Sequence, residues 1–212
     1  MTPRPRLVIL DFDGTLADSF PWFCEVYDSV AERFRFARLG PDELQALRSC
    51  GPREVMERLG VSPHKVPAIV RHTRALKARD LHRVGLFPGI AEALRALSRA
   101  GVRLAIVSSD VERSIRQVLG PELAGLIDHY DCGASLFGKP AKMRAVLRRS
   151  GVAAAEALAI GDEVRDAEAA RSVGMPFGAV AWGYALPEAL AALGPAMMFR
   201  TPAAIAALAE AG

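Results

Sequence analysis

The chain has few cysteines and no long apolar run. Its three cysteines, Cys24, Cys50 and Cys132, are widely spaced, form no Cys-x-x-Cys pair and have no histidine at zinc-ligand spacing. Unpaired buried thiols in a reducing compartment are therefore expected, rather than a disulfide framework or a zinc site. Nowhere do about 18 apolar residues follow one another, so no transmembrane helix is expected.

The net charge is also small. With 27 basic and 24 acidic residues the formal charge is +3, which is too weak to indicate a nucleic-acid partner. The first six residues lead directly into an apolar stretch without a signal segment, so we expect a cytoplasmic protein that makes no membrane contact. At 212 residues with 51% hydrophobic composition, the chain fits a soluble globular protein of one domain with an insertion, or two small domains.

What the sequence does have is a short apolar run that ends at two carboxylates. Residues 7–10 fit a buried strand of a parallel sheet, and Asp11 and Asp13 follow directly. Open α/β sheets bind ligands at the carboxyl ends of their strands. Two like charges this close favour a hard divalent cation between them, with Mg²⁺ the natural candidate. Such a carboxylate can also act as a nucleophile that forms an acyl-phosphate.

The next two residues suit a phosphate. Gly14 lets the backbone approach an anion closely, and the Thr15 hydroxyl is a hydrogen-bond donor. Taken alone, however, an Asp-x-Asp-Gly string is more simply a turn between a strand and a helix.

Two further apolar runs also end at polar residues. Residues 102–107 end at Ser108, Ser109 and Asp110, and residues 157–160 end at a Gly-Asp-x-x-x-Asp string. The alternation of strands and helices predicts a doubly wound α/β sheet. Polar residues at these positions are also ordinary helix caps, and we expect Ser109 or Asp110 to cap the helix that follows.

The Gly-Asp-x-x-x-Asp string contains Asp162 and Asp166. Standing four residues apart, they share one face if the helix has begun, and then both point toward Asp11. Glu163 is expected to face solvent. Lys139, between a glycine and a proline at the start of a helix, adds a mobile positive charge to an N-terminus that favours anions. Alone it is simply a loop lysine, and Lys142 is an alternative.

Residues 19–84 contain no convincing strand. An amphipathic helix is expected from residue 20 to 34, and further helices over residues 42–48, 52–59 and 62–81. The last of these has a basic excess that is suited either to attracting an anionic substrate or to forming a solvated helix face. The six basic residues, opposed by Asp80 alone, are Lys65, Arg71, Arg74, Lys77, Arg79 and Arg83.

The rest of the chain completes the sheet. Strands are expected over residues 131–137, 177–181 and 196–199, and helices over residues 111–119, 187–193 and 203–210. Trp182 and Tyr184 follow one of these strands, and we expect them to pack rather than to contact a substrate.

Taken together and in order, these stretches resemble the four motifs of the haloacid dehalogenase-like superfamily, whose members are mostly Mg²⁺-dependent phosphatases. Asp11-Phe12-Asp13-Gly14-Thr15-Leu16 looks like the first motif, Ser108 the second, Lys139 the third, and the string from Asp162 to Asp166 the fourth. The resemblance implies a doubly wound parallel core, residues 1–18 and 85–212, with an inserted all-helical cap, residues 19–84.

The same resemblance implies roles for individual residues. Asp11 would be the nucleophile, Asp13 the general acid and base, and Lys139 the cation that steadies the aspartyl-phosphate. The implied Mg²⁺ ligands are Asp11, the main-chain carbonyl of Asp13, and Asp162. Asp166 would be a further ligand, or would accept a hydrogen bond without touching the metal. The implied phosphate-binding residues are Gly14, Thr15, Ser108, Ser109 and Lys139.

The subgroup that the chain resembles most is that of the phosphoglycolate phosphatases. A small phosphorylated metabolite is therefore the expected partner, with 2-phosphoglycolate as the best guess, bound by a monomer or homodimer. Asp13 favours phosphate over halide, since dehalogenating members lack that carboxylate. One departure is the Ser108-Ser109-Asp110 string, where many members have Thr-Asn followed by a basic residue.

Several alternatives to this function stay open. They are a sugar-phosphate or nucleotide phosphatase, a phosphomutase, and a non-catalytic phospho-accepting or binding protein.

Overall fold

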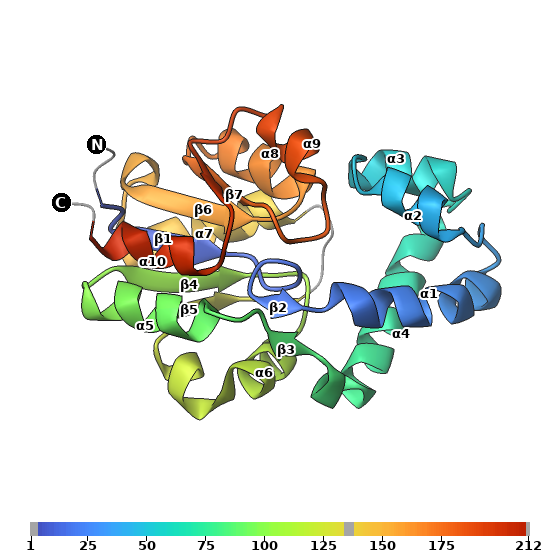
Figure 1. Cartoon of the computed structure of the whole chain (residues 1–212), viewed down its shortest axis with the longest axis horizontal. Helices are drawn as coiled ribbons and strands as arrows, with labels where there is room; N and C mark the ends of the chain where they lie inside the picture. Colours follow the sequence, from blue (N-terminus) through green and yellow to red (C-terminus); the bar gives the residue numbers. More distant parts are fainter. Residues whose placement is uncertain (1–3, 134–137, 211–212) are drawn as a thin grey trace.

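The computed structural model describes residues 4–133 and 138–210 and is built around one parallel sheet (Figure 1). Its strands are β1 (Leu7–Leu10), β4 (Arg103–Val107), β5 (His129–Asp131), β6 (Ala157–Gly161), β7 (Phe177–Val180) and β8 (Met197–Phe199). They lie in the order β5-β4-β1-β6-β7-β8, and every neighbouring pair is parallel. The predicted doubly wound α/β core is thereby confirmed.

Helices cover both faces of this sheet. The helices of the core are α5 (Ile90–Arg99), α6 (Glu112–Gly125), α7 (Lys139–Ser150), α8 (Val164–Ser172), α9 (Pro187–Ala191) and α10 (Ala203–Ala206). Because side chains alternate along a strand, Val8 and Leu10 of β1 pack with α5, α6 and α10, whereas Leu7 and Ile9 pack with α7, α8 and α9. Burial on both faces explains why this strand is a continuous apolar run.

A group of four helices lies to one side of the sheet (Figure 1). These are α1 (Phe20–Phe34), α2 (Pro41–Leu47), α3 (Pro52–Arg58) and α4 (Val66–Arg79), and residues 19–84, all of them described, contain no strand. A short antiparallel pair, β2 (Ala17–Asp18) with β3 (Gly85–Leu86), joins this block to the core. Buried side chains of Tyr27, Ala31 and Leu59 pack α1 against the end of α3.

Three boundaries differ from those predicted. The helix expected over residues 111–119 continues as α6 through a bend at Gly120, whose φ of 72° lets the chain turn before Pro121. The strand expected over residues 131–137 is β5, which begins at His129 because its pairing with Ala105 of β4 sets the register. Residues 134–137 lie outside the described residues. The last predicted helix is α10 followed by a 3₁₀ turn.

The three cysteines are free thiols, as predicted, but the prediction that they are buried is wrong, since all three are partly exposed. Burial raises the pKa of Cys132 to about 12, which keeps that thiol protonated. Among the described residues, none of the helices has both the length and the apolar character needed to cross a bilayer.

Candidate active site

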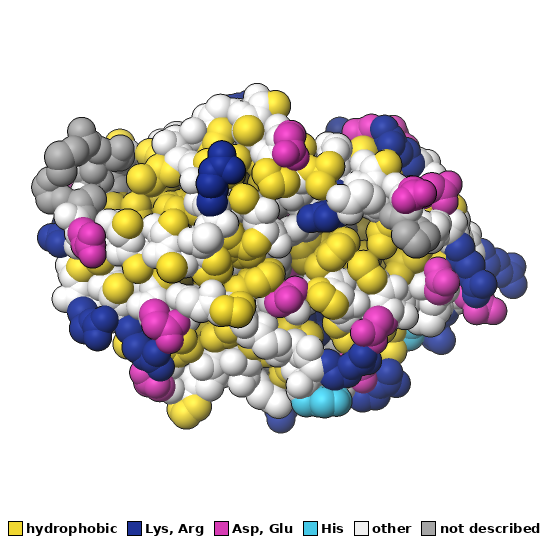
Figure 2. Space-filling model, viewed as in Figure 1, with side chains coloured by type: hydrophobic (Ala, Val, Ile, Leu, Met, Phe, Trp, Pro, Cys, Tyr) yellow, Lys and Arg dark blue, Asp and Glu magenta, His cyan; other side chains and the backbone are white. Residues whose placement is uncertain are grey.

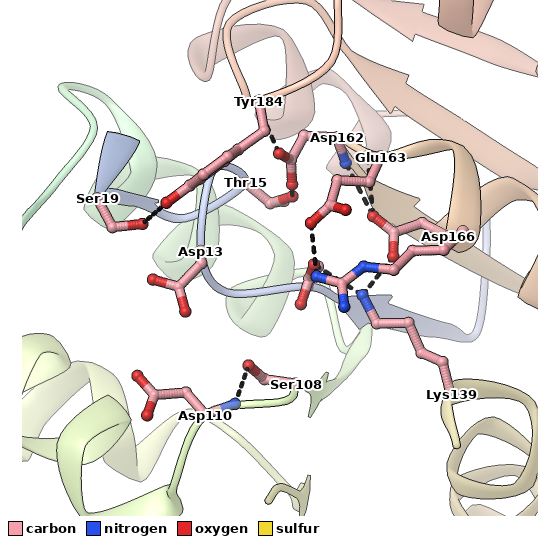
Figure 3. Close-up of polar contacts among 12 residues, drawn as sticks. Asp13, Thr15, Ser19, Ser108, Asp110, Lys139, Asp162, Glu163, Asp166 and Tyr184 are labelled. Atoms are coloured by element: carbon pink, nitrogen blue, oxygen red, sulfur yellow. Dashed lines mark hydrogen bonds and ion pairs between the residues drawn. The ribbon is translucent and has the colours of Figure 1, made fainter. Parts of the chain in front are cut away.

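The residues that follow β1, β4 and β6 meet at one edge of the sheet. Leu10 pairs with Ile106 of β4 on one side and with Ile160 of β6 on the other, so the three strands end almost level. Asp11, Ser108 and Asp162 are consequently brought together, and all three side chains are buried. Figure 3 shows Ser108 and Asp162 with Asp13, Lys139 and Asp166 around the same space.

Three of these side chains form a tight acidic cluster. One carboxylate oxygen from each of Asp11, Asp162 and Asp166 lies within 4.8 Å of the others. Burial, reinforced by neighbouring acidic charges, raises the pKa of Asp162 well above its usual range. Burial and the charge of Asp11 likewise raise the pKa of Asp166 to about 6, against the opposing charge of Lys139. Such a cluster favours a cation.

Lys139 supplies one positive charge to the cluster. Its ammonium nitrogen lies 2.7 Å from Asp11 Oδ2 and donates a hydrogen bond to Asp166. Lys139 therefore bridges the carboxylates of Asp11 and Asp166, and all three side chains are buried. Lys142 points elsewhere and donates to the backbone carbonyls of Ser108 and Gly133.

Both oxygens of Asp166 already have donors. Oδ1 accepts from Lys139, and Oδ2 accepts from the backbone N–H groups of Asp162, at 3.1 Å, and Glu163, at 3.0 Å. The carboxylate therefore ties the turn between β6 and α8 to the lysine. Glu163 was expected to face solvent, and this is wrong: its side chain is 24% exposed and pairs with Arg165 at 2.5 Å.

Gly14 and Thr15 bring the loop after β1 against Asp162. Gly14 has a φ of 78°, and a Cβ there would lie 2.1 Å from Asp162 Oδ2 and 2.4 Å from the ring of Tyr184. The Thr15 hydroxyl donates to Asp162 Oδ1 at 2.6 Å. Since that proton is engaged with Asp162, Thr15 orients this carboxylate in the structure.

Trp182 and Tyr184 belong to the same loop cluster. Trp182 Nε1 donates to the Thr15 carbonyl at 3.1 Å, and the Tyr184 N–H donates to Asp162 Oδ2 at 2.8 Å. The Tyr184 hydroxyl is 3.1 Å from Ser19 Oγ (Figure 3). Both aromatic residues therefore pack and hold the loop, as expected, and whether either also contacts a substrate stays a prediction.

A lysine from α4 reaches the site, and sequence reasoning did not single it out. Lys77 is only 7% exposed at its side chain; it donates to Asp13 and, at 2.6 Å, to Asp110 Oδ2. Burial and the charge of Asp110 raise the pKa of Asp13, against the opposing charge of Lys77. One turn earlier, Arg74 donates to the Ser109 carbonyl. Their spacing of three, which places both on one helix face, was the available signal.

The prediction that Ser109 or Asp110 caps the helix after β4 is wrong. No side chain caps α6, whose N-cap residue is Val111. Asp110 instead accepts from the neighbouring Val111 N–H at 2.7 Å and pairs with Lys77, which satisfies both of its oxygens. Ser108 Oγ accepts from the Asp110 N–H at 3.0 Å, so its own hydroxyl proton is left to donate.

Comparison with known proteins identifies the family. Residues 8–180 match the family described as haloacid dehalogenase-like hydrolase. The chain is 30% identical to a phosphoglycolate phosphatase of Synechococcus elongatus, over 93% of each chain. It is 32% identical to the tyrosine-protein kinase PtkA of Mycobacterium bovis, over 85% of this chain and 63% of that one. A putative phosphoglycolate phosphatase structure from Lactobacillus plantarum superposes with a TM-score of 0.82 and 24% identity, covering 98% of this chain and 100% of the other.

The chain therefore belongs to the haloacid dehalogenase-like hydrolases, the family that its motifs resemble. Within that family it falls in the phosphoglycolate phosphatase-like subgroup and is a phosphatase.

Proposed function

We propose that this phosphatase is a Mg²⁺-dependent phosphomonoester hydrolase that works through an aspartyl-phosphate on Asp11. The observation that carries the proposal is the buried Asp11 carboxylate directly after β1, which lies 2.7 Å from the Lys139 ammonium and shares the acidic cluster with Asp162 and Asp166. A carboxylate held in this way beside a cation can attack phosphorus. The likeness to the phosphoglycolate phosphatase of Synechococcus elongatus makes 2-phosphoglycolate the first substrate to test. We further propose that the protein is a cytoplasmic monomer or homodimer.

The chain's own residues account for each step. Asp11 attacks the phosphorus, while the Lys139 ammonium and the Ser108 hydroxyl stabilise the charge on the non-bridging oxygens. The loop at Gly14 and Ser109, next to Ser108, complete the proposed phosphate site, whereas Thr15 contributes by holding the Asp162 carboxylate in place. Asp13 protonates the departing alkoxide and then removes a proton from the water that hydrolyses the intermediate.

The donor set fits a Mg²⁺ ion. Two positive side chains, Lys139 and Arg165, offset only part of the negative charge of four acidic side chains, those of Asp11, Asp162, Glu163 and Asp166. Carboxylate oxygens are the ligands that Mg²⁺ prefers. Asp11, Asp162 and the main-chain carbonyl of Asp13 would hold it, with Asp166 behind them fixing Lys139 and the turn. Bound Mg²⁺ would add positive charge at the transferred phosphoryl group.

We also propose that residues 19–84 form a cap over a core of residues 1–18 and 85–212. The cap contacts the core through Lys77 and Arg74 on one side. On the other, Arg48 donates to the carbonyls of Tyr184 at 2.8 Å and Gly183 at 3.0 Å. Closure at both contacts would exclude water from the intermediate.

The test is release of phosphate from a panel of phosphomonoesters that includes 2-phosphoglycolate, with Mg²⁺ and with a chelator. Turnover should require Mg²⁺, and Asp11→Asn should lower it by about 10³-fold or more. The matched control is Asp18→Asn, an exposed carboxylate after the same strand, which should keep full activity. Retained activity in Asp11→Asn would remove Asp11 from the role of nucleophile.

The likeness to a tyrosine-protein kinase supports one other candidate, transfer of the phosphoryl group to a tyrosine hydroxyl instead of water. Mass spectrometry of the protein after incubation with ATP and Mg²⁺ separates the two functions. Phosphotyrosine without steady release of phosphate would favour the kinase.

A further inference from the structure

A cavity of about 330 Å³ lies between helices α1 to α4 and the core. Its lining is mostly hydrophobic and draws on all four helices, with Phe23 from α1, Leu47 from α2, Met56 from α3 and Ile69 from α4. Figure 2 shows hydrophobic side chains gathered where these helices meet the core. We call this cavity the apolar chamber.

The core side of the apolar chamber is made by residues of the candidate active site. Glu163, Arg165 and Tyr184 all line it. Tyr184 also donates its N–H to Asp162 and touches Gly14, because a Cβ on Gly14 would lie 2.4 Å from its ring. The wall between the chamber and the loop after β1 is therefore a single side chain thick.

This wall is neutral as well as thin. Arg165 and Glu163 form an ion pair at 2.5 Å, so their charges cancel where the chamber meets the acidic cluster. A substrate as small as 2-phosphoglycolate would leave the apolar lining of the chamber in contact with water, whereas an apolar leaving group would remove that surface from water. The cavity volume lies at the lower end of the range of small-molecule sites, about 300–1,000 Å³.

We propose that the apolar chamber binds the apolar part of the leaving group of a phosphomonoester. The inference rests on the proposed function and extends its substrate class to phosphate esters of alkyl or aromatic alcohols. With the phosphate at Asp11 and Lys139, a change in the position of the Tyr184 side chain would open the wall and let the alcohol portion enter the chamber.

The lining of the chamber is mostly apolar, and the charge of Arg165 is paired with Glu163. Arg48 donates to the backbone carbonyls of Gly183 and Tyr184. Such a lining favours an apolar group over a carboxylate of the same size.

The test is a series of straight-chain alkyl phosphates from methyl to octyl, assayed for phosphate release with Mg²⁺. The value of kcat/KM should rise about three- to fourfold for each added methylene until the chamber is filled. A flat series, in a protein that turns over methyl phosphate and 2-phosphoglycolate, overturns this inference and leaves the proposed function standing.

Three variants of α4 locate the effect. Val70 lines the chamber, so Val70→Phe should lower the ratio of kcat/KM for octyl over methyl phosphate by about tenfold or more. Val70→Ala should move the preference to longer chains, and it keeps the test decisive if the larger residue prevents folding. Ala75→Phe, at an exposed position of the same helix, is the control and should keep the wild-type ratio. Equal ratios in all three variants overturn the inference.

A binding measurement separates this inference from the proposed function. Calorimetry in the presence of Mg²⁺ compares hexylphosphonate with methylphosphonate, neither of which is hydrolysed. Tighter binding of hexylphosphonate that Val70→Phe removes would uphold the chamber even if no ester is turned over. Equal affinities would overturn it.

Discussion

Asp13 differs from the other carboxylates of the site in exposure and in partner. Its side chain is 26% exposed, and it pairs with a lysine from α4 rather than joining the acidic cluster. Burial and the charge of Asp110 raise its pKa, which favours a carboxyl that holds a proton more firmly than a surface aspartate does. A group that donates and then accepts a proton benefits from such a shift.

Asp13→Asn should therefore separate substrates by leaving group. Hydrolysis of alkyl phosphates should fall by about 10²–10⁴-fold, since a poor leaving group needs the proton, and hydrolysis of aryl phosphates should fall less. The measurement is kcat for both classes in the variant and the wild type. Equal losses on the two classes would argue against acid catalysis by Asp13.

Gly14 allows a test of close packing at one residue. Gly14→Ala should lower the free energy of unfolding sharply, because the new Cβ would lie 2.1 Å from Asp162 Oδ2. Gly60→Ala is the matched control: its φ of +66° is similar, nothing lies within 4 Å, and only strain of about 1–2 kcal/mol is expected. Chemical denaturation of both variants measures the difference, and equal losses would mean that the contact with Asp162 is unimportant.

At the scale of elements, α4 is the helix of residues 19–84 that reaches into the candidate active site. It carries Lys77 into the core between two carboxylates and contributes Ile69 and Val70 to the apolar chamber. The same 14-residue helix thus contacts Asp13, the proposed acid and base, and lines the apolar chamber.

Lys77→Met should cost stability as well as activity. Without the ammonium, Asp13 and Asp110 face each other unpaired, and removing one partner of a buried pair costs about 3–5 kcal/mol; the partial exposure of Asp13 reduces this. Protonation relieves the repulsion, so the loss should be largest near neutral pH and shrink as the pH falls toward 4. Denaturation at several pH values checks this, with Arg71→Met on the exposed face as control. A loss independent of pH would contradict the pairing.

Whether a residue of the candidate active site could be found from the sequence depends on its place in the fold. Asp11, Ser108 and Asp162 each follow an apolar run, and the topology of a doubly wound sheet brings strand ends together, so local patterns were sufficient. Lys139 was found through its motif. Lys77 and Arg165 were not singled out. The spacing of Arg74 and Lys77 places them on one face of α4, but whether that face is buried depends on how the helix packs against distant segments.

At the scale of the whole molecule, the acidic cluster links stability to pH and metal. Burial and the charge of Asp11 raise the pKa of Asp166 from 3.8 to about 6, against the opposing charge of Lys139, so the native state holds more protons than the unfolded chain between these values. Stability without a divalent ion should therefore fall as the pH rises through this window. Metal binding requires deprotonated carboxylates and should offset the loss.

Mg²⁺ should accordingly raise Tm more at pH 7.5 than at pH 5. Thermal unfolding with Mg²⁺ and with a chelator at both pH values measures this, and Asp18→Asn should behave like the wild type. Asp162→Asn should lose most of the Mg²⁺ effect. An equal rise of Tm at both pH values would contradict the link between the cluster and the ion.

The antiparallel pair of β2 and β3 has a consequence for how this molecule can evolve. The chain leaves the core at Asp18 and returns at Gly85, and these two residues are paired across the ladder. Because departure and return are neighbours, the intervening 66 residues can change in length without displacing the strands of the sheet. A segment exchanged at this junction must still place a cation where Lys77 pairs with Asp13 and Asp110 of the core.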